Sequence, residues 1–278
     1  MLVVAALLGA AMGMVIGGLG GGGGVLTVPA LVYTLGQTAQ DATTSSVIIV
    51  GITALAGASA RVRGTQIAWR TGIAFGLVGI PVTYLGTQLN HHVSQPVLLL
   101  AFAVITIIAA TAMLLDNRRD SSAHERPSGS DADTDTEMFS AGTPSTTVLA
   151  TRSRPLSFVA KIVVCGSAVG FLTGFLGVGG GFLVVPALVM VLRTPMTLAI
   201  ATSLLIIAMN SASTLASRLG NLHLNWTVVA PFTIAAIVGS FAGKRLADKL
   251  TGNTLITAFA IMLVLVGFLV GTQSLLSL

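Results

Sequence analysis

The chain contains eight apolar stretches, which are separated by polar segments. Six of them have the length of one membrane-spanning helix, about 20 residues, and these cover 43–60, 71–89, 97–115, 198–216, 227–246 and 254–273. The other two, 2–35 and 158–192, have about 35 residues with glycines near the middle, which is too long for one span and short for two. Each of these two stretches predicts a hairpin of two short helices joined at a glycine turn.

The order of the stretches is the same in both halves of the chain. Residues 17–32 read GGLGGGGGVLTVPALV, and residues 174–189 read GFLGVGGGFLVVPALV. At this spacing of 157 residues, 15 of the 24 positions from Gly9 to Val32 match, and Trp69 aligns with Trp226. The sequence therefore predicts an all-α integral membrane protein of two repeats, each a glycine-broken helical hairpin followed by three transmembrane helices.

A polar segment separates the two repeats. It is rich in Asp, Ser, Thr and Pro and cannot bury enough apolar surface to fold, so we interpret it as a disordered linker. The predicted organisation is repeat 1 over 1–115, a linker on the cytoplasmic side over 116–157, and repeat 2 over 158–278.

Positive charges orient the two repeats. Arg61, Arg63 and Arg70 lie two spans from the basic ends of the linker, so both regions are on one side, which the positive-inside rule assigns to the cytoplasm. In the second repeat the basic cluster is instead at 244–249, one span from the loop that follows Arg218. The repeats are therefore predicted to be inverted with respect to the membrane. The alternative is two parallel repeats of four spans each.

Composition restricts the class of protein further. Hydrophobic residues make up 54% of the chain, charged residues only 8%, and the mean hydropathy is +0.92, whereas a soluble domain has roughly 25% charged residues. These values favour a multi-pass protein of the cell membrane, inner or plasma. We interpret the net charge of +5 as a topology signal and expect no nucleic-acid partner. One cysteine, Cys165, excludes an internal disulfide, and neither a metal nor a cofactor is predicted.

The glycine turns are the candidate substrate site. In hydrocarbon, irregular backbone is tolerated only where it is buried in protein or lines a polar cavity. Glycine lets the backbone approach a ligand closely, and helix N-termini attract anions. We expect an anion near mid-membrane between the two turns, at the backbone N–H groups of Gly22, Gly23, Gly24, Gly179, Gly180 and Gly181. The alternative is that these glycines only allow close helix packing.

Polar side chains follow each hairpin and can complete an oxyanion site. They donate hydrogen bonds without adding charge, although the same groups also form ordinary interhelical bonds. The candidates are Ser45, Ser46, Thr202, Ser203 and Asn210. Arg61 and Arg218 each end one of these spans. They are candidates either for the two entrances of the transport path or for contacts with lipid headgroups.

The doubled motif resembles the TauE/SafE sulfite exporter family. The pattern GxxxGxxGxGGGxxxVPxL runs from Gly170 to Leu188, the segment ATSLLIIAMNS follows at 201–211, and the first copy of the pattern lies between Gly13 and Leu31. The resemblance covers nearly the whole chain outside the linker. It implies a permease of the prokaryotic inner membrane that moves small sulfur-containing or organic anions, such as sulfite, thiosulfate or sulfonates.

Together these features predict a transporter that exports small sulfur-containing anions, with the anion and the lipid bilayer as partners. The apolar stretches contain no carboxylate to couple transport to protons or sodium, but an inside-negative potential alone drives a monovalent anion outward by about 2.3 kcal/mol per 100 mV. One alternative is a membrane accessory protein without transport. An intramembrane enzyme is less favoured, because the spans lack a cluster of His, Asp, Glu and Cys residues.

Overall fold

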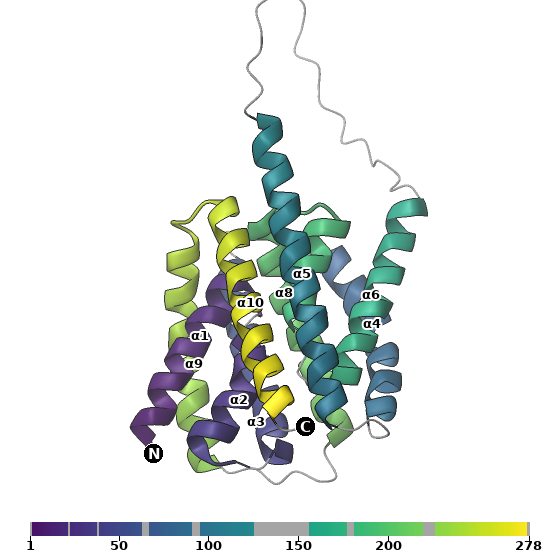
Figure 1. The fold of residues 1–278 in the computed structure, drawn as a ribbon. Coiled ribbons are helices and arrows are strands. Elements are labelled where there is room, and N and C mark those ends of the chain that lie inside the picture. Colours follow the sequence, from purple (N-terminus) through teal and green to yellow (C-terminus); the bar gives the residue numbers. More distant parts are fainter. Residues whose placement is uncertain are drawn as a thin grey trace, which may run out of the picture.

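The computed structural model describes residues 2–21, 23–37, 39–62, 67–90, 95–124, 156–176, 181–218 and 226–276, and all regular secondary structure in them is helical. The first half contains α1 (Leu2–Leu19), α2 (Gly23–Leu35), α3 (Ala39–Val62), α4 (Trp69–Asn90) and α5 (Gln95–His124). The second half contains α6 (Leu156–Leu176), α7 (Gly181–Pro186), the π-helix η1 (Ala187–Val191), α8 (Met196–Arg218), α9 (Trp226–Ala247) and α10 (Gly252–Leu276) (Figure 1).

The helices follow the apolar stretches of the sequence. A backbone in hydrocarbon must satisfy its own hydrogen bonds, so each long apolar stretch becomes a helix. The two stretches with central glycines are broken as predicted, into α1 and α2 in the first half and into α6, α7 and η1 in the second. Helix α5 continues to His124 and α6 begins at Leu156, so both helices extend into the segment predicted as the linker, 116–157. Residues 125–155, the rest of the predicted linker, lie outside the described residues.

Four of the described helices are long and apolar enough to cross a membrane by themselves. Their spans are Asp41–Val62, Met196–Ala216, Trp226–Ala247 and Gly252–Thr272. Shorter apolar helical segments are Val3–Leu19, Gly23–Val32, Leu100–Asp116, Val159–Phe175 and Gly181–Val191. The chain is thus an all-helical membrane protein that crosses the bilayer several times.

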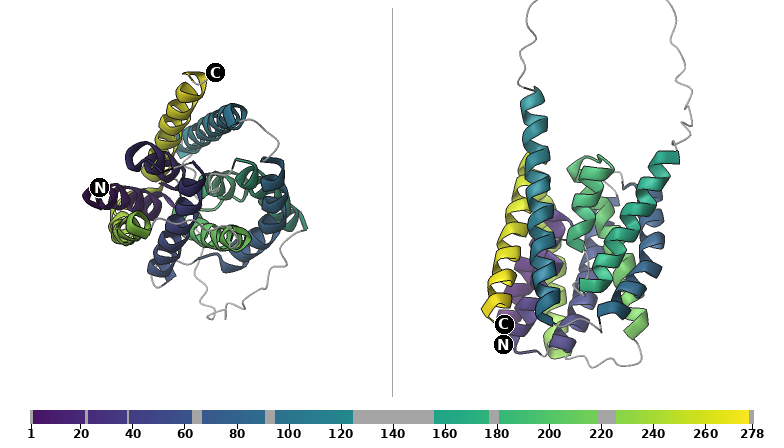
Figure 2. Two further views of the ribbon diagram at one scale, coloured as in Figure 1. Left: turned by 90° about the horizontal axis from the view of Figure 1, so that it is seen from below. Right: turned by 45° about the vertical axis from the view of Figure 1, so that its right-hand side comes forward.

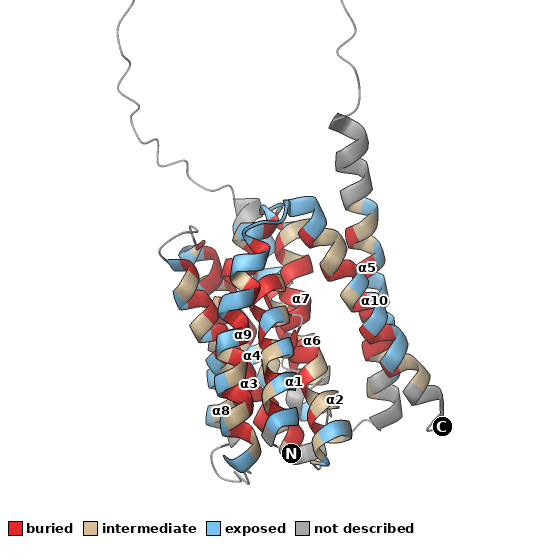
Figure 3. Ribbon diagram, turned by 90° about the vertical axis from the view of Figure 1, so that its left-hand side faces the viewer, coloured by how far each residue is buried: buried red, intermediate tan, exposed pale blue. Residues whose placement is uncertain are grey.

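Large apolar side chains cover the outside of the bundle. Examples on four different helices are Leu77, Ile108, Val164 and Phe268, each at least 60% exposed. Figure 3 shows exposed residues alternating with buried ones along the outward helices. In water this surface would drive aggregation, whereas in a bilayer it faces lipid tails of similar polarity.

Each hairpin packs mainly on the opposite half of the chain. Helix α1 has its most extensive contact with α9, and α6 has its most extensive contact with α4. Helix α3 packs on α8, and α5 packs on α10. If the two halves are exchanged, α1 becomes α6 and α9 becomes α4, so these pairings map onto one another. The pairing supports the prediction of two structural repeats.

Individual close contacts obey the same exchange. A Cβ atom on Gly13 in α1 would lie 2.5 Å from the Cα atom of Ala236, and one on Gly170 in α6 would lie 2.6 Å from the carbonyl oxygen of Gly79. Gly13 aligns with Gly170 and Gly79 aligns with Ala236 at the 157-residue spacing. Small residues therefore bring the two backbones together in both hairpin contacts, as is usual for helices in membranes.

The two halves run in opposite directions through the bundle. Figures 1 and 2 show the start of α1 and the end of α10 at one end of the molecule, which we call the terminal end. The end of α5 and the start of α6 lie at the opposite end, which we call the linker end. Helix α1 therefore runs inward from the terminal end and α6 runs inward from the linker end. This arrangement supports the prediction of inverted repeats.

The inverted relation predicts opposite chemical accessibility at equivalent positions. Arg70 and Thr227 are both exposed, and they are equivalent at the 157-residue spacing. In a variant whose single Cys165 is replaced by Ser, we expect Arg70→Cys and Thr227→Cys to react with a membrane-impermeant maleimide from opposite sides of the membrane. Labelling of both cysteines in intact cells, or of both only after the cells are opened, would favour parallel repeats instead.

Candidate functional site

The first glycine turn reverses the chain between α1 and α2. Gly20 has φ +77° and Gly21 has φ +118°, a region of backbone conformation that residues with a Cβ atom rarely adopt. The Gly24 N–H donates a hydrogen bond to the Gly21 carbonyl oxygen, at 3.1 Å. This turn therefore needs glycine for its conformation, and one of the predicted anion donors, the Gly24 N–H, is used within the turn.

The first glycine turn lies against the start of α7 inside the bundle. A Cβ atom on Gly21 would lie 3.1 Å from the carbonyl oxygen of Gly181, and a Cβ atom on Gly181 would lie 3.2 Å from the carbonyl oxygen of Gly21. Of the predicted glycine donors, Gly23, Gly24 and Gly181 are buried. Gly22, Gly179 and Gly180 lie outside the described residues. The structure thus brings the start of α2 and the start of α7 together.

Two apolar side chains occupy the space beside the turns. The Cδ1 atom of Ile207 in α8 would overlap a Cβ atom on Gly21 and lies 2.7 Å from the Cβ position of Gly181. The methyl groups of Val50 in α3 lie 3.4 Å from the Cβ position of Gly24. Both side chains are buried, and they occupy equivalent positions of the two repeats. The sequence analysis did not identify either residue as part of the site, because both have the pattern of ordinary core positions.

Ser203 is bonded directly to the first turn. Its hydroxyl lies 2.7 Å from the Gly20 carbonyl oxygen and 2.9 Å from that of Ile200, so its one proton is shared between these two acceptors. The predicted hydroxyl of Ser203 is therefore at the glycine turn, as expected, but it stabilises the turn in this structure. A bound anion would have to compete for the same proton.

Ser46 and Thr202 donate within their own helices. The Ser46 hydroxyl donates to the Thr43 carbonyl oxygen at 2.9 Å, and the Thr202 hydroxyl donates to that of Leu198 at 2.8 Å. The Thr202 oxygen also accepts the N–H of Ala68, at 3.3 Å, which ties α8 to the segment before α4. Of these bonds, only the one between Thr202 and Ala68 joins separate segments of the chain, as the alternative interpretation of the hydroxyls expected.

Besides a guanidinium nitrogen of Arg61, three buried polar atoms on α3 and α8 have no hydrogen-bond partner in the described part of the chain. They are Ser45 Oγ, Thr53 Oγ1 and Asn210 Oδ1, and each residue is less than 7% exposed. A buried polar group without a partner costs about 1–3 kcal/mol, so such groups often mark a place for water or a ligand. Ser45 and Asn210 were predicted from the sequence. Thr53 was missed, although it aligns with Asn210 at the repeat spacing.

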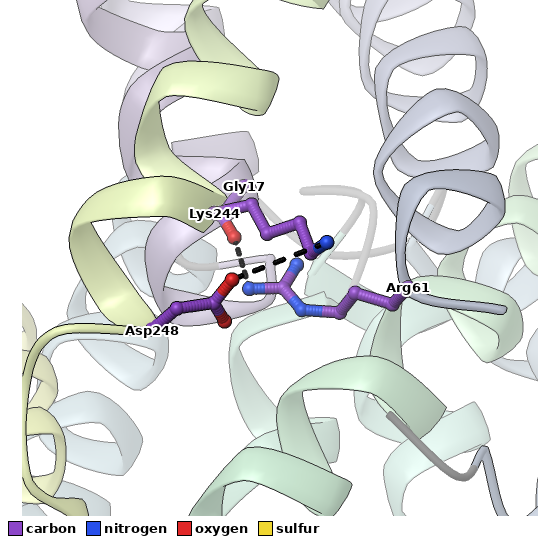
Figure 4. Close-up of polar contacts among 4 residues, drawn as sticks. All are labelled: Gly17, Arg61, Lys244 and Asp248. Carbon is purple, nitrogen blue, oxygen red and sulfur yellow. Dashed lines mark hydrogen bonds and ion pairs between the residues drawn. The ribbon is translucent and has the colours of Figure 1, made fainter. Parts of the chain in front are cut away.

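Arg61 is inside the protein rather than at the lipid surface. Its side chain is only 3% exposed, and its Nη2 atom donates to the carbonyl oxygen of Gly17 at 2.6 Å (Figure 4). The interpretation of Arg61 as a contact with lipid headgroups is therefore wrong. Arg218 ends α8, but its side chain lies outside the described residues. One predicted entrance residue is thus a buried cation one turn from the glycine turn.

The residues around the first glycine turn are neutral apart from Arg61. Among the described residues, no three His, Cys, Asp or Glu side chains are grouped closely enough to hold a metal ion. The polar groups around the turns are backbone amides, hydroxyls and one amide side chain, with a guanidinium one turn away.

Known proteins agree with a transport role. The family model of the sulfite exporter TauE/SafE matches residues 5–270. A "Probable membrane transporter protein" of Xylella fastidiosa is 28% identical over 88% of this chain and 84% of its own length. The "Probable membrane transporter protein YunE" of Bacillus subtilis is 26% identical over 95% of both chains. No solved structure matches. The chain belongs to the TauE/SafE family of membrane transporters.

Proposed function

We propose that the protein exports small sulfur-containing oxyanions or sulfonates, such as sulfite or thiosulfate, and binds them between the two glycine turns. The observation that carries this proposal is the contact of the turn at Gly21 with the start of α7 at Gly181, deep inside the bundle. Two helix N-termini meet there, and each is worth up to about 1 kcal/mol for a nearby anion. The family supports the class of protein.

Polar side chains at equivalent positions of α3 and α8 support a polar path past the turns. Ser203, Ile207 and Asn210 lie on one face of α8, and Ser46, Val50 and Thr53 lie on the equivalent face of α3. On each helix an apolar side chain separates two polar positions. We infer that Ile207 and Val50 close the path in this conformation and that an anion passes when the two helices move apart.

The direction follows from charge and membrane potential. The basic residues at the linker end assign that end to the cytoplasm by the positive-inside rule. An inside-negative potential then favours movement of an anion from the linker end to the terminal end, by about 2.3 kcal/mol per charge and 100 mV. The proposal therefore needs no coupling ion for export.

Efflux from proteoliposomes tests this function. The full chain is reconstituted with radiolabelled sulfite, thiosulfate or sulfoacetate inside, and a potential is imposed with potassium and valinomycin. We expect efflux of at least one of these anions. The efflux should be faster when the imposed potential makes the lumen of the liposome negative. Liposomes without protein are the control. No efflux of any of the three anions above that control would contradict the proposal and favour an accessory protein.

A further inference from the structure

A second polar cluster lies where α1, α3 and α9 meet near the linker end. Its centre is the guanidinium of Arg61, which is almost fully buried. The Nη2 atom is bonded to Gly17, but the Nη1 atom is buried without a hydrogen-bond partner among the described residues. A buried guanidinium with an unused donor is costly unless an anion or water completes it.

Ser240 in α9 adds a second unused group to this cluster. It is 1% exposed, and its Oγ atom has no partner in the described part of the chain. The Oγ atom lies 2.9 Å from the Cβ position of Gly57, which is one turn before Arg61 on the same face of α3. A Cβ atom on Gly17 would lie 2.5 Å from the Cα atom of Ser240. Arg61 and Ser240 therefore share the neighbour Gly17.

Charged residues connect the cluster to the surface. Lys244 and Asp248 follow Ser240 at intervals of four residues, and Lys244 Nζ lies 4.0 Å from a carboxylate oxygen of Asp248. The Asp248 carboxylate points toward the Arg61 guanidinium and interacts with it electrostatically (Figure 4). Lys244 also lines a surface hollow of about 460 Å³ together with Ser59, Ala60, Phe241 and Arg245.

The paired charges of this cluster have no counterparts at the equivalent place of the other repeat. The positions equivalent to Ser240, Lys244 and Asp248 are Thr83, Thr87 and His91. Neither a lysine nor a carboxylate is present among them. Of the two equivalent places, only the one at the linker end therefore has this pair of opposite charges. The hairpin contacts themselves occur in both repeats.

We propose that Arg61, Ser240 and Lys244 form an oxyanion-binding site at the entrance on the linker end, and that the Asp248 carboxylate occupies it at rest as a tethered competitor. The ligand class rests on the proposed function: a small sulfur oxyanion or sulfonate. The guanidinium and ammonium supply charge-assisted hydrogen bonds, and the Ser240 hydroxyl supplies a neutral donor. Asp248 is half-exposed, so it can swing into solvent when the anion binds.

Sulfite binding to the full chain in neutral phosphatidylcholine nanodiscs tests the site, with isothermal titration calorimetry as the measurement. Asp248→Asn should tighten binding by about fivefold, the value of one exposed ion pair. Arg61→Gln should weaken binding by at least about tenfold, because a hydrogen bond to a charged group is lost. In the Arg61→Gln background, Asp248→Asn should have no further effect. Lys249→Gln, which removes an exposed cation next to Asp248, is the control for net charge.

Arg61→Lys covers the case in which Arg61→Gln does not fold. It retains the charge but loses the forked donors, so its binding should be weaker than that of the wild type and stronger than that of Arg61→Gln. Equal effects of Asp248→Asn with and without Arg61, or wild-type binding by both Arg61 variants, would overturn the proposal.

Nanodiscs with phosphatidylglycerol test whether the anion bound at this site is instead a lipid headgroup. If that lipid competes with sulfite in the wild type but not in Arg61→Gln, the site binds lipid headgroups and the entrance proposal is wrong.

Flux measurements separate this proposal from the transport function. If no variant transports sulfite but binding still depends jointly on Arg61 and Asp248, the transport function fails and the entrance site stands. If Arg61→Gln transports sulfite with the wild-type half-saturation concentration, the transport function stands and the entrance site fails.

Discussion

Gly13→Val is expected to destabilise the protein strongly. Gly13 lets α1 lie directly against α9, and a Cβ atom there would overlap the carbonyl oxygen of Ala236. A backbone cannot move aside like a side chain, so the two helices must separate along their whole contact. Overpacking of a tight contact costs about 1–3 kcal/mol, and a valine at this backbone contact should reach the upper end of that range. The measurement is the thermal unfolding temperature in detergent, together with the fraction of monodisperse protein.

The 157-residue spacing supplies a matched variant. Gly170→Val affects the equivalent contact of α6 with Gly79 in α4 and should cause a similar loss. Gly252→Ala is the control, because a Cβ atom on Gly252 would meet nothing within 4 Å. Normal yield and unfolding temperature for Gly13→Val would show that α1 and α9 are farther apart than described.

Gly21→Ala is expected to lower transport at least about tenfold while the protein remains folded. Alanine at φ +118° is strained by about 1–3 kcal/mol, where 1.4 kcal/mol corresponds to a factor of ten. Its Cβ atom would also overlap Cδ1 of Ile207, the flexible end of a side chain that can move. The turn should therefore change shape and displace the start of α2. The measurement is the initial rate of anion efflux at equal amounts of folded protein.

Gly36→Ala is the matched control for backbone strain. Gly36 also has a positive φ, +64°, but a Cβ atom there would meet nothing within 4 Å, and it lies at the other end of α2. We expect wild-type transport from this variant. An equal loss from Gly36→Ala and Gly21→Ala would indicate general destabilisation, and wild-type transport by Gly21→Ala would place the path elsewhere. Gly23→Val is a poorer probe, because its Cβ atom would lie 2.7 Å from the Met12 carbonyl oxygen.

The fold could be predicted from the sequence where one-dimensional patterns determine it. Apolar lengths predicted the helices, and the glycine runs predicted the breaks, because both depend on local hydropathy and backbone freedom. The repeat spacing relates Gly36 to Arg193, and both residues have a positive φ, +64° and +48°. It also relates the Gln37 N–H and Thr194 N–H, which donate to the carbonyl oxygens of Leu31 and Leu188 at the same distance of 3.2 Å.

The site could be predicted only in part. Glycines and hydroxyls near the turns were identified, but their bonds depend on neighbours from distant parts of the chain. An arginine at the end of a span gives the same sequence pattern whether its side chain reaches lipid or the protein interior. The burial of Arg61 could therefore not be predicted. The extension of α5 to His124 was missed because its last residues are polar and hydropathy marks only the apolar part of a helix. Asp248 lies close enough to Arg61 to interact with it, and this agrees with the prediction that both regions are on one side.

The crossed packing of the hairpins also has a consequence for the time course of synthesis. Helix α1 finds its main partner in α9, which is encoded about 200 residues later, and ribosomes add roughly 5–20 residues per second. The first hairpin therefore waits roughly 10 to 40 seconds in the membrane before α9 has been made. During that interval the glycine face of α1 is open to lipid or to the insertion machinery. A pause in translation between α8 and α9 would prolong this state, and the newly made chain would be most vulnerable to membrane proteases during that pause.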